Sequence, residues 1–359
     1  MVSPSDGERI LTQDIRRTYI QAEKDIISKV ANFVKKGKDV PGWHKRKLAQ
    51  LDQFTGEVQQ EILEEQLGTV RDKKIREGVK KAYQKGQRSA VNALKEGGQD
   101  VAIAGRFGET DRRTVEALSR SLTQSLNNTH FRITREAEDV YRRVVGEGIR
   151  GHVAGGQSRI EASQRILNDF ADQGIVGFTD RTGRNWSLSA YTEMATRTTA
   201  GQAALEGQVN RMKDNDHDLA IVGTSYEPCP ICMPWEEVVL SISGENEDYP
   251  SLADAEGAGL FHPNCTHSLT PYIEGVTEKE TEGKEEKADK AERYQEREQQ
   301  RHNERQIRKW KKRKVGCMTE DECLKASQKI KEWQEKQRNF IDETGRYRKY
   351  NREQITGLE

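Results

Sequence analysis

The chain has 359 residues, of which 33% are hydrophobic and another 33% are charged. A composition this polar argues against a densely cored enzyme over the whole length and favours long, solvated helices with modest burial. Lysine plus arginine equals aspartate plus glutamate at 59 each, so no overall field attracts the protein to DNA or acidic membranes. The sequence shows neither an export signal nor an apolar run of about 18 residues that would span a membrane.

Residues 1–174 are predicted to form a mainly α region without recognisable chemistry. Apolar residues recur there every three or four positions, which is the spacing of one buried helix face. A further helix should begin after Ser158, with Glu161 completing a capping box. His130 is expected to be solvated or hydrogen-bonded rather than a ligand. The periodic segments predict helices over residues 8–36, 45–67, 70–94 and 111–148. The last range could form one long helix or two stacked helices.

Residues 175–275 predict a small α+β domain. Short apolar segments flank a polar turn between residues 175 and 186, which favours a β-hairpin. Ser187 or Ser189 is expected to cap the helix that follows. A sheet of such short strands buries little apolar surface, so a bound ion could supply stability that the core does not. Short strands are expected at residues 217–222 and 238–243, and residues 268–272 could form a third. Residues 244–259 are expected to form an acidic loop.

Two short turns in this domain offer soft metal ligands. Cys229-Pro-Ile-Cys232 is followed, after 29 residues, by His262-Pro-Asn-Cys265-Thr-His267. Paired Cys or His residues on one tight turn can point at a single ion, as a closed tetrahedral zinc site requires. Five candidates are present for four positions, so we expect a structural zinc rather than a catalytic one with a position open to water. The candidate ligands are Cys229, Cys232, Cys265, His267 and His262.

The cysteines also admit other interpretations. Cys229 and Cys232 could form a redox-active pair, or the three thiols of the two turns could be buried as small apolar groups. The second turn has no place in a redox motif, and Met233-Pro-Trp does not begin a helix convincingly. Cys317 and Cys323 fit no common ligand pattern and are interpreted as incidental. Five cysteines in all favour a reducing compartment over a disulfide framework.

Residues 276–359 predict a charged linker and a helical C-terminal tail. Within this tail, seven cations surround one tryptophan, and this is the best candidate for contact with nucleic acid in the chain, because cations screen phosphates and an indole can stack on a base. The alternative is a solvated helix face whose cations pair with the acidic run upstream. The segment comprises Arg305, Arg308, Lys309, Trp310, Lys311, Lys312, Arg313 and Lys314.

An enzyme would need a reactive constellation, and we find only a faint one. His217 lies among Asp214, Asp216 and Asp218, as in an HNH-like nuclease in which a histidine activates water beside a divalent metal. Such a zinc-containing nuclease, or another DNA-processing enzyme, is the alternative function. A polar turn ahead of a strand explains these residues more simply, and no phosphate-binding loop or nucleophile elbow is present. We therefore expect a protein that is not an enzyme.

An ordered set of motifs runs through the second half of the chain, at residues 183–191, 195–199, 229–232, 262–272, 305–310, 333–334 and 338–341. Together these motifs resemble the tailed-phage minor capsid proteins, the Mu F-like minor head protein group. The resemblance covers most of residues 175–350, whereas the helical N-terminal half is similar only in general character. Two departures stand out: Thr266 replaces a frequent Arg, and Glu236-Glu237 replaces a frequent Gly.

The resemblance implies a structural protein of the phage head, assembled in the host cytoplasm and located in the virion. It implies association with the portal vertex, a role in head assembly or DNA passage, and contacts with the portal protein, other head proteins and packaged DNA. Neither a membrane nor a small-molecule substrate is expected as a partner. Relatives with Cys at the last ligand position favour Cys229, Cys232, Cys265 and His267 as the four zinc ligands, which leaves His262 to fix the turn.

Overall fold

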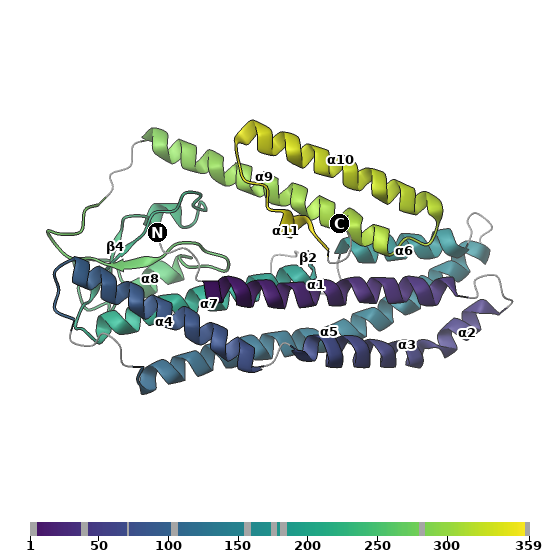
Figure 1. Ribbon diagram of the computed structural model, residues 1–359, viewed down its shortest axis with the longest axis horizontal. Helices are drawn as coiled ribbons and strands as arrows, with labels where there is room; N and C mark the ends of the chain where they lie inside the picture. The colour runs from purple at the N-terminus through teal and green to yellow at the C-terminus, as the bar shows by residue number, and fades with distance from the viewer. Residues whose placement is uncertain are drawn as a thin grey trace. The chain divides into compact units, whose positions relative to one another are not determined.

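The computed structural model describes residues 6–36, 42–69, 72–101, 107–153, 159–173, 178–179, 185–279 and 284–355, and most of these are helical (Figure 1). The chain divides into two compact units, each assembled from three separated segments. Unit 1 comprises residues 1–14, 71–125 and 193–297, and unit 2 comprises residues 15–70, 126–192 and 298–359. The boundaries of the two units therefore do not coincide with the changes in composition after residues 174 and 275. Each unit joins segments that are far apart in the sequence. No described helix combines the length and apolarity that crossing a membrane requires.

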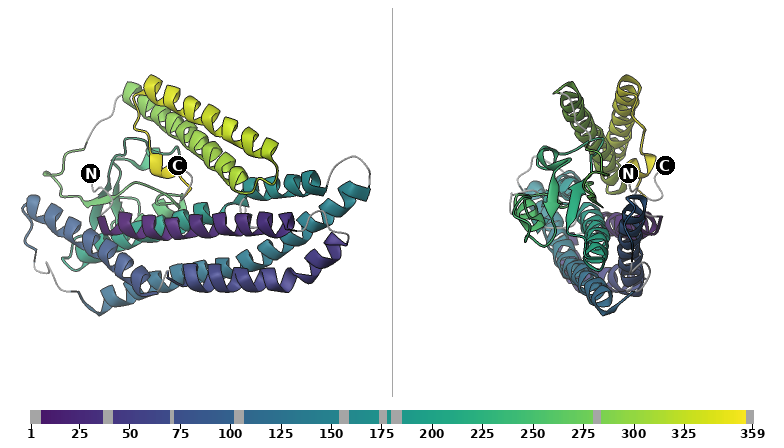
Figure 2. Two further views of the ribbon diagram at one scale, coloured as in Figure 1. Left: turned by 45° about the vertical axis from the view of Figure 1, so that its right-hand side comes forward. Right: turned by 90° about the vertical axis from the view of Figure 1, so that its left-hand side faces the viewer.

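Unit 2 is built around long helices that pack through aromatic rings. Tyr141 stacks on Phe54 with ring centroids 4.6 Å apart, and Phe33 meets both rings edge-on. The Tyr141 hydroxyl donates to the Lys47 carbonyl at 3.0 Å, so the ring is oriented as well as buried. Figures 1 and 2 show the parent helices side by side. The helices are α1 (Asp6–Lys35), α2 (Trp43–Ala49), α3 (Leu51–Glu57), α5 (Glu109–Val153) and α6 (Arg159–Gln173).

One of these helices differs from the sequence-based expectation, and for another the structure decides between two alternatives. The helix predicted over residues 45–67 is interrupted at Gln50 and continues as a π-helix over Val58–Gln66. Wider π-helical turns bring positions four and five apart onto one face, and Val58, Ile62 and Leu63 are indeed all buried. The segment predicted over 111–148 forms a single helix of 45 residues. Ser158, the predicted cap of α6, lies outside the described residues.

The C-terminal part of the chain forms a helical hairpin of α9 (Lys284–Val315) and α10 (Glu320–Thr344), followed by the short α11 (Tyr350–Glu353) (Figure 1). Residues of α9 up to 297 belong to unit 1, and the rest belongs to unit 2. Thr319 caps α10 by accepting from the Glu322 amide at 3.3 Å. Gly345 ends α10 with φ of 67°, a left-handed conformation that glycine adopts without strain. The sequence predicted a linker or a solvated helix for residues 277–290, and the described residues of that range are helical from Lys284 on.

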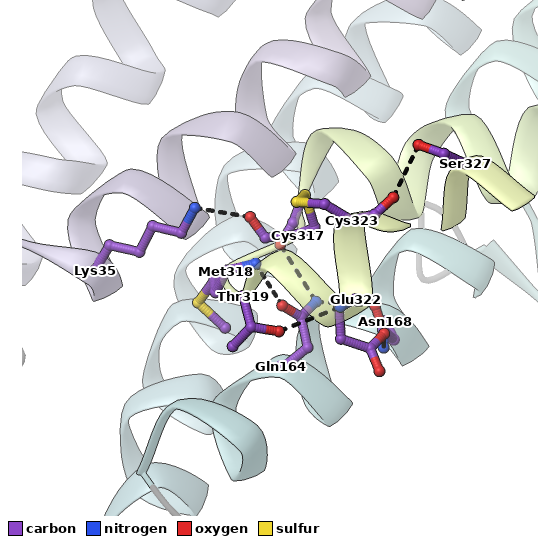
Figure 3. Close-up of a disulfide and its surroundings, with 10 residues drawn as sticks. Lys35, Gln164, Asn168, Cys317, Met318, Thr319, Glu322, Cys323 and Ser327 are labelled. Carbon is purple, nitrogen blue, oxygen red and sulfur yellow. Dashed lines mark hydrogen bonds between the residues drawn. A yellow bond between two sulfur atoms is a disulfide. The ribbon is translucent and has the colours of Figure 1, made fainter. Parts of the chain in front are cut away.

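The turn between α9 and α10 contains a disulfide that joins Cys317 and Cys323, whose Cα atoms are 5.3 Å apart (Figure 3). Gln164 of α6 donates to the Gly316 carbonyl at 3.3 Å and accepts from the Met318 amide at 2.6 Å, so its single side chain holds the turn. The interpretation of the two cysteines as incidental was therefore wrong. Their pairing depends on the turn geometry, which the spacing alone does not reveal.

Unit 1 contains α4 (Asp72–Glu96), most of α7 (Leu188–Lys213) and a three-stranded antiparallel sheet. Its strands are β4 (Val239–Ser241), β3 (Leu219–Val222) and β5 (Leu269–Pro271) in that spatial order. All three lie where the sequence predicts them. A Cβ atom on Gly86 or Gly207 would overlap the backbone of the facing helix, so α4 and α7 pack at close range. The Gln208 side chain donates to the Leu269 carbonyl at 2.9 Å and fixes β5 against α7.

Smaller elements complete the chain. The predicted hairpin is confirmed by the antiparallel pairing of β1 (Phe178–Thr179) with β2 (Asn185–Trp186), and the residues between them lie outside the described part. Ser187 accepts from the Ala190 amide at 3.3 Å, as expected of the cap of α7. The predicted acidic loop instead contains α8 (Leu252–Gly257), because Ser251 caps it and its Leu252 and Ala255 side chains are buried.

Candidate metal centre

The two cysteine-containing turns meet at one end of the sheet in unit 1. Val222 ends β3 and pairs with Leu269, which begins β5, so the loop leaving β3 and the loop entering β5 emerge together. The first loop carries Cys229 and Cys232, and the second carries His262, Cys265 and His267.

Local backbone geometry shapes each turn. The Cys229 carbonyl accepts from the amides of Cys232 at 3.1 Å and Met233 at 2.9 Å, and the His262 carbonyl accepts from the Cys265 amide at 2.8 Å. Asn264 supplies the left-handed residue of the second turn, with φ of 66°, a conformation that asparagine tolerates better than most residues. Both turns therefore curl back on themselves.

The ligand atoms form two overlapping groups that share Cys232. In each group, made of Cys229, Cys232 and His262 or of Cys232, Cys265 and His267, the atoms lie within 4.8 Å of one another. The Sγ atoms of Cys232 and Cys265 are 3.6 Å apart, which joins the two turns. All five candidates are thus brought together. Thiols and imidazoles are the kinds of donor that zinc prefers, whereas magnesium and calcium prefer oxygen.

Backbone amides also stabilise negative charge on two of the sulfur atoms. The Cys232 amide donates to Cys229 Sγ at 3.4 Å, and the His267 amide donates to Cys265 Sγ at 3.4 Å. Hydrogen bonding with Cys232 and with His267 outweighs burial and lowers the pKa of Cys265 to about 4. Burial would raise the pKa of Cys229, but the contact with His262 lowers it overall. Thiolates are the metal-binding form of cysteine, so these two shifts favour ligation. The contact with Cys265 raises the pKa of Cys232, so a metal would have to displace the proton of that thiol.

The His267 ring is held from both sides. Its Nδ1 atom lies 3.4 Å from Cys265 Sγ, while Nε2 lies 2.9 Å from the Glu236 carboxylate. Burial alone would lower the pKa of His267, but Cys265 and Glu236 raise it to about 9. A histidine that contacts a carboxylate through one nitrogen and faces the ligands with the other has the arrangement found at zinc centres.

His262 has a similar arrangement with a weaker partner. Its Nε2 atom lies 2.9 Å from Cys229 Sγ, and its Nδ1 atom lies 2.9 Å from the carbonyl of Pro263. Both residues are partly exposed as a whole, but the His267 side chain is only 1% exposed. Geometry therefore brings both histidines within reach of a metal, and the deeper burial and carboxylate contact distinguish His267.

Sequence reasoning missed the two charged residues behind this centre. The Glu236 carboxylate is 3% exposed and also accepts from Lys290 Nζ at 2.9 Å. Lys290 lies on α9, 54 positions further along the chain, so only the fold reveals the pair. Glu237 has φ of 61°, a left-handed conformation that glycine adopts with less strain than glutamate does.

The cationic segment of α9 is largely engaged within unit 2. Asp172 binds both Lys309, at 2.9 Å, and Arg313, and Lys312 lies 2.7 Å from the buried carboxylate of Glu23. Lys311 is buried as well, and Arg308 donates to the Arg352 carbonyl. The Arg313 guanidinium lies over the Trp310 ring, which occupies one face of the indole. Of the seven cations, Arg305 and Lys314 are the exposed ones.

These contacts favour the alternative in which the cations of this helix face pair with acidic groups. The partners are Asp172 and Glu23 rather than the acidic run upstream. DNA binding at this segment has no geometric support beyond its two exposed cations. It stays a prediction from the sequence.

His217, the histidine of the nuclease hypothesis, is not part of the cysteine centre. His217 precedes β3, and its neighbour Asp218 accepts from the Ser241 hydroxyl and the Ser243 amide, both at 2.7 Å. Asp216 has φ of 54°, as in a turn. Within the described ranges, His217 belongs to neither group of metal-binding side chains. The geometry therefore matches a turn that leads into a strand.

Comparison with known proteins identifies the family. The model described as phage minor capsid protein 2 matches residues 8–342. The chain belongs to the phage minor capsid protein 2 family. A structural protein of Lactococcus phage LL-H is 25% identical over 369 residues, covering 98% of each chain. A structural protein of Lactococcus phage mv4 is 38% identical over 120 residues, covering 32% of this chain and 97% of that protein. No solved structure matches the chain.

Membership of the phage minor capsid protein 2 family confirms the expectation of a phage minor capsid protein and extends it. The match begins at residue 8 and so includes the helical N-terminal half, where the sequence motifs offered only general similarity. Both units therefore belong to one family architecture. A structural protein of the virion, with other head proteins as its partners, is the function that this family indicates.

Proposed function

We propose that this minor capsid protein belongs to the portal vertex of a tailed-phage head and acts in head assembly or DNA passage. The family match over residues 8–342 is the observation that carries the structural role. The resemblance of the motifs in residues 175–350 to portal-associated head proteins supports the location. Long helices with polar outer faces suit a protein that spans between larger assemblies rather than one that encloses a substrate.

We further propose that one zinc ion binds Cys229, Cys232, Cys265 and His267 and holds unit 1 together. The sheet has three strands of three or four residues each, and such a sheet buries little by itself. The two turns face each other through their sulfur and imidazole groups, so an ion between them would add to the hydrogen bonds that already join the loop after β3 to the loop before β5. Zinc would act as a structural clamp, with no reaction assigned to it.

Localisation in the virion tests the portal assignment. Purified phage particles carrying a small tag on this protein should be imaged by electron cryomicroscopy and analysed by quantitative mass spectrometry. We expect a few copies per virion, confined to one vertex. Density distributed over the icosahedral faces, or absence of the protein from purified virions, would overturn the assignment.

A cleavage assay tests the non-enzymatic role. Purified protein incubated with supercoiled DNA and Mg²⁺, Mn²⁺ or Zn²⁺ should leave the DNA intact. Metal-dependent nicking that disappears in His217→Ala would refute the structural role and restore the nuclease hypothesis.

A further inference from the structure

Glu236 joins three separate segments of unit 1 through one buried carboxylate. It follows the first cysteine turn, and its Oε1 atom accepts from the Ser225 amide at 2.7 Å and contacts His267 Nε2 at 2.9 Å. Its Oε2 atom accepts from Lys290 Nζ at 2.9 Å. Every oxygen of this carboxylate is used, which is what a carboxylate only 3% exposed requires.

The contact with Glu236 decides which nitrogen of His267 can bind a metal. A carboxylate accepts hydrogen bonds, so in the neutral imidazole that a metal requires it holds the proton on Nε2, and the lone pair of Nδ1 then faces Cys265. The same contact prevents the ring from rotating. His262 has only a backbone carbonyl in the corresponding position.

The first turns of α9 bind to the same cysteine turn. Besides Lys290, Arg293 donates to the Tyr226 carbonyl at 3.0 Å, and Arg297 donates to the Glu227 carbonyl at 2.8 Å. The Arg293 guanidinium also lies 4.5 Å from the centre of the Tyr226 ring. Residues 290, 293 and 297 lie on one helix face. The acceptors of Arg293 and Arg297 precede Cys229 in the chain, whereas the acceptor of Lys290 follows Cys232.

We infer that Glu236 is a positioning residue that orients His267 for the metal and couples metal occupancy to the docking of α9 residues 286–297. The coupling is reciprocal, since an ion that orders the first cysteine turn also orders the acceptors of Arg293 and Arg297. Docked α9 in turn keeps Lys290 against the carboxylate. This inference rests on the proposed zinc site.

Zinc affinity and amide hydrogen exchange, measured on the full chain, test the coupling. Glu236→Gln should weaken zinc binding by about 10-fold or more, as loss of such a carboxylate does at other zinc centres. Zinc should slow exchange across residues 286–297 in the wild type, and this protection should be reduced in Glu236→Gln. Glu247→Gln, an exposed change in the same unit, is the matched control and should behave as the wild type does.

Two further variants separate orientation of the ligand from general damage. In Glu236→Gln combined with His267→Cys, zinc affinity should recover, because a thiolate needs no partner to orient a ring. Lys290→Met should lose protection of residues 286–297 and weaken zinc binding only by the share that docking of α9 contributes, which is less than the loss in Glu236→Gln.

The outcomes distinguish the inference from the zinc site itself. Wild-type protein that binds no zinc would overturn both. Wild-type protein that binds zinc, with unchanged affinity in Glu236→Gln or unchanged exchange over residues 286–297 on metal removal, would overturn the coupling alone.

Discussion

The backbone carbonyl of Ala204 on α7 occupies the position that a side chain on Gly86 of α4 would need. Gly207 stands in the same relation to the carbonyl of Tyr83, so each helix contributes one glycine to the close approach. Backbone atoms cannot move aside as a flexible side chain can. This seam positions α7, which carries the contacts to β5 and to the second cysteine turn.

Gly86→Ala and Gly207→Ala should each destabilise unit 1 by about 1–3 kcal/mol or more, because the added methyl group overpacks a rigid interface. Urea denaturation followed by circular dichroism measures the change. Gly201→Ala on α7 is the control, since nothing lies within 4 Å of its added carbon. That substitution should be neutral or stabilise by about 0.5–1 kcal/mol. Equal stability of all three variants would contradict the close packing of α4 on α7.

His130 should make the stability of unit 2 depend on pH. Its Nε2 atom lies 2.6 Å from the Tyr19 hydroxyl, and burial lowers its pKa. The unfolded chain binds a proton near the ordinary pKa of about 6.5, whereas the folded chain resists protonation until lower pH. Stability should therefore fall as pH decreases from about 6.5 toward the folded-state pKa.

The comparison for this prediction is His130→Gln, which retains an acceptor for Tyr19 but does not titrate. The difference in unfolding free energy between wild type and variant should shift in favour of the variant below about pH 6.5. A pH-independent difference between pH 5 and 8 would show that His130 titrates alike in both states.

The disulfide between Cys317 and Cys323 leaves three of the five cysteines free to react with a thiol reagent. Protein prepared without reductant, denatured and treated with a chelator should expose three reactive thiols, from Cys229, Cys232 and Cys265. Reduction should raise the count to five. Replacing both Cys317 and Cys323 by Ser should cost about 2 kcal/mol, because the bond closes a short loop. Five thiols before reduction would show that the pair stays reduced.

Most helices could be predicted because their signal is local. Apolar residues three or four apart located α1, α4, α5 and α7, with ends displaced by a few residues. The six-residue α8 was missed because it is too short to show periodicity. The break in the helix at Gln50 and the π-helix after it depend on packing, which local spacing does not record.

The residues of the candidate site were likewise predictable only where their sequence signal is local. Cys229 and Cys232, like Cys265 and His267, lie on single turns, so their spacing alone predicts a shared ligand site. Glu236 and Lys290 are 54 residues apart, and nothing in their local sequence indicates that they meet. The cations near Trp310 pair with Glu23 and Asp172, which lie far away in the chain. Long-range ion pairs of this kind become visible only with the fold.

Metal content is the most direct test of the zinc clamp in unit 1. Elemental analysis of purified wild-type protein, His262→Ala and His267→Ala should be made at equal protein concentration after dialysis against metal-free buffer. We predict about one zinc per chain in the wild type and in His262→Ala, and loss of zinc in His267→Ala. Absence of zinc from the wild type, or its loss from His262→Ala with retention in His267→Ala, would contradict the account.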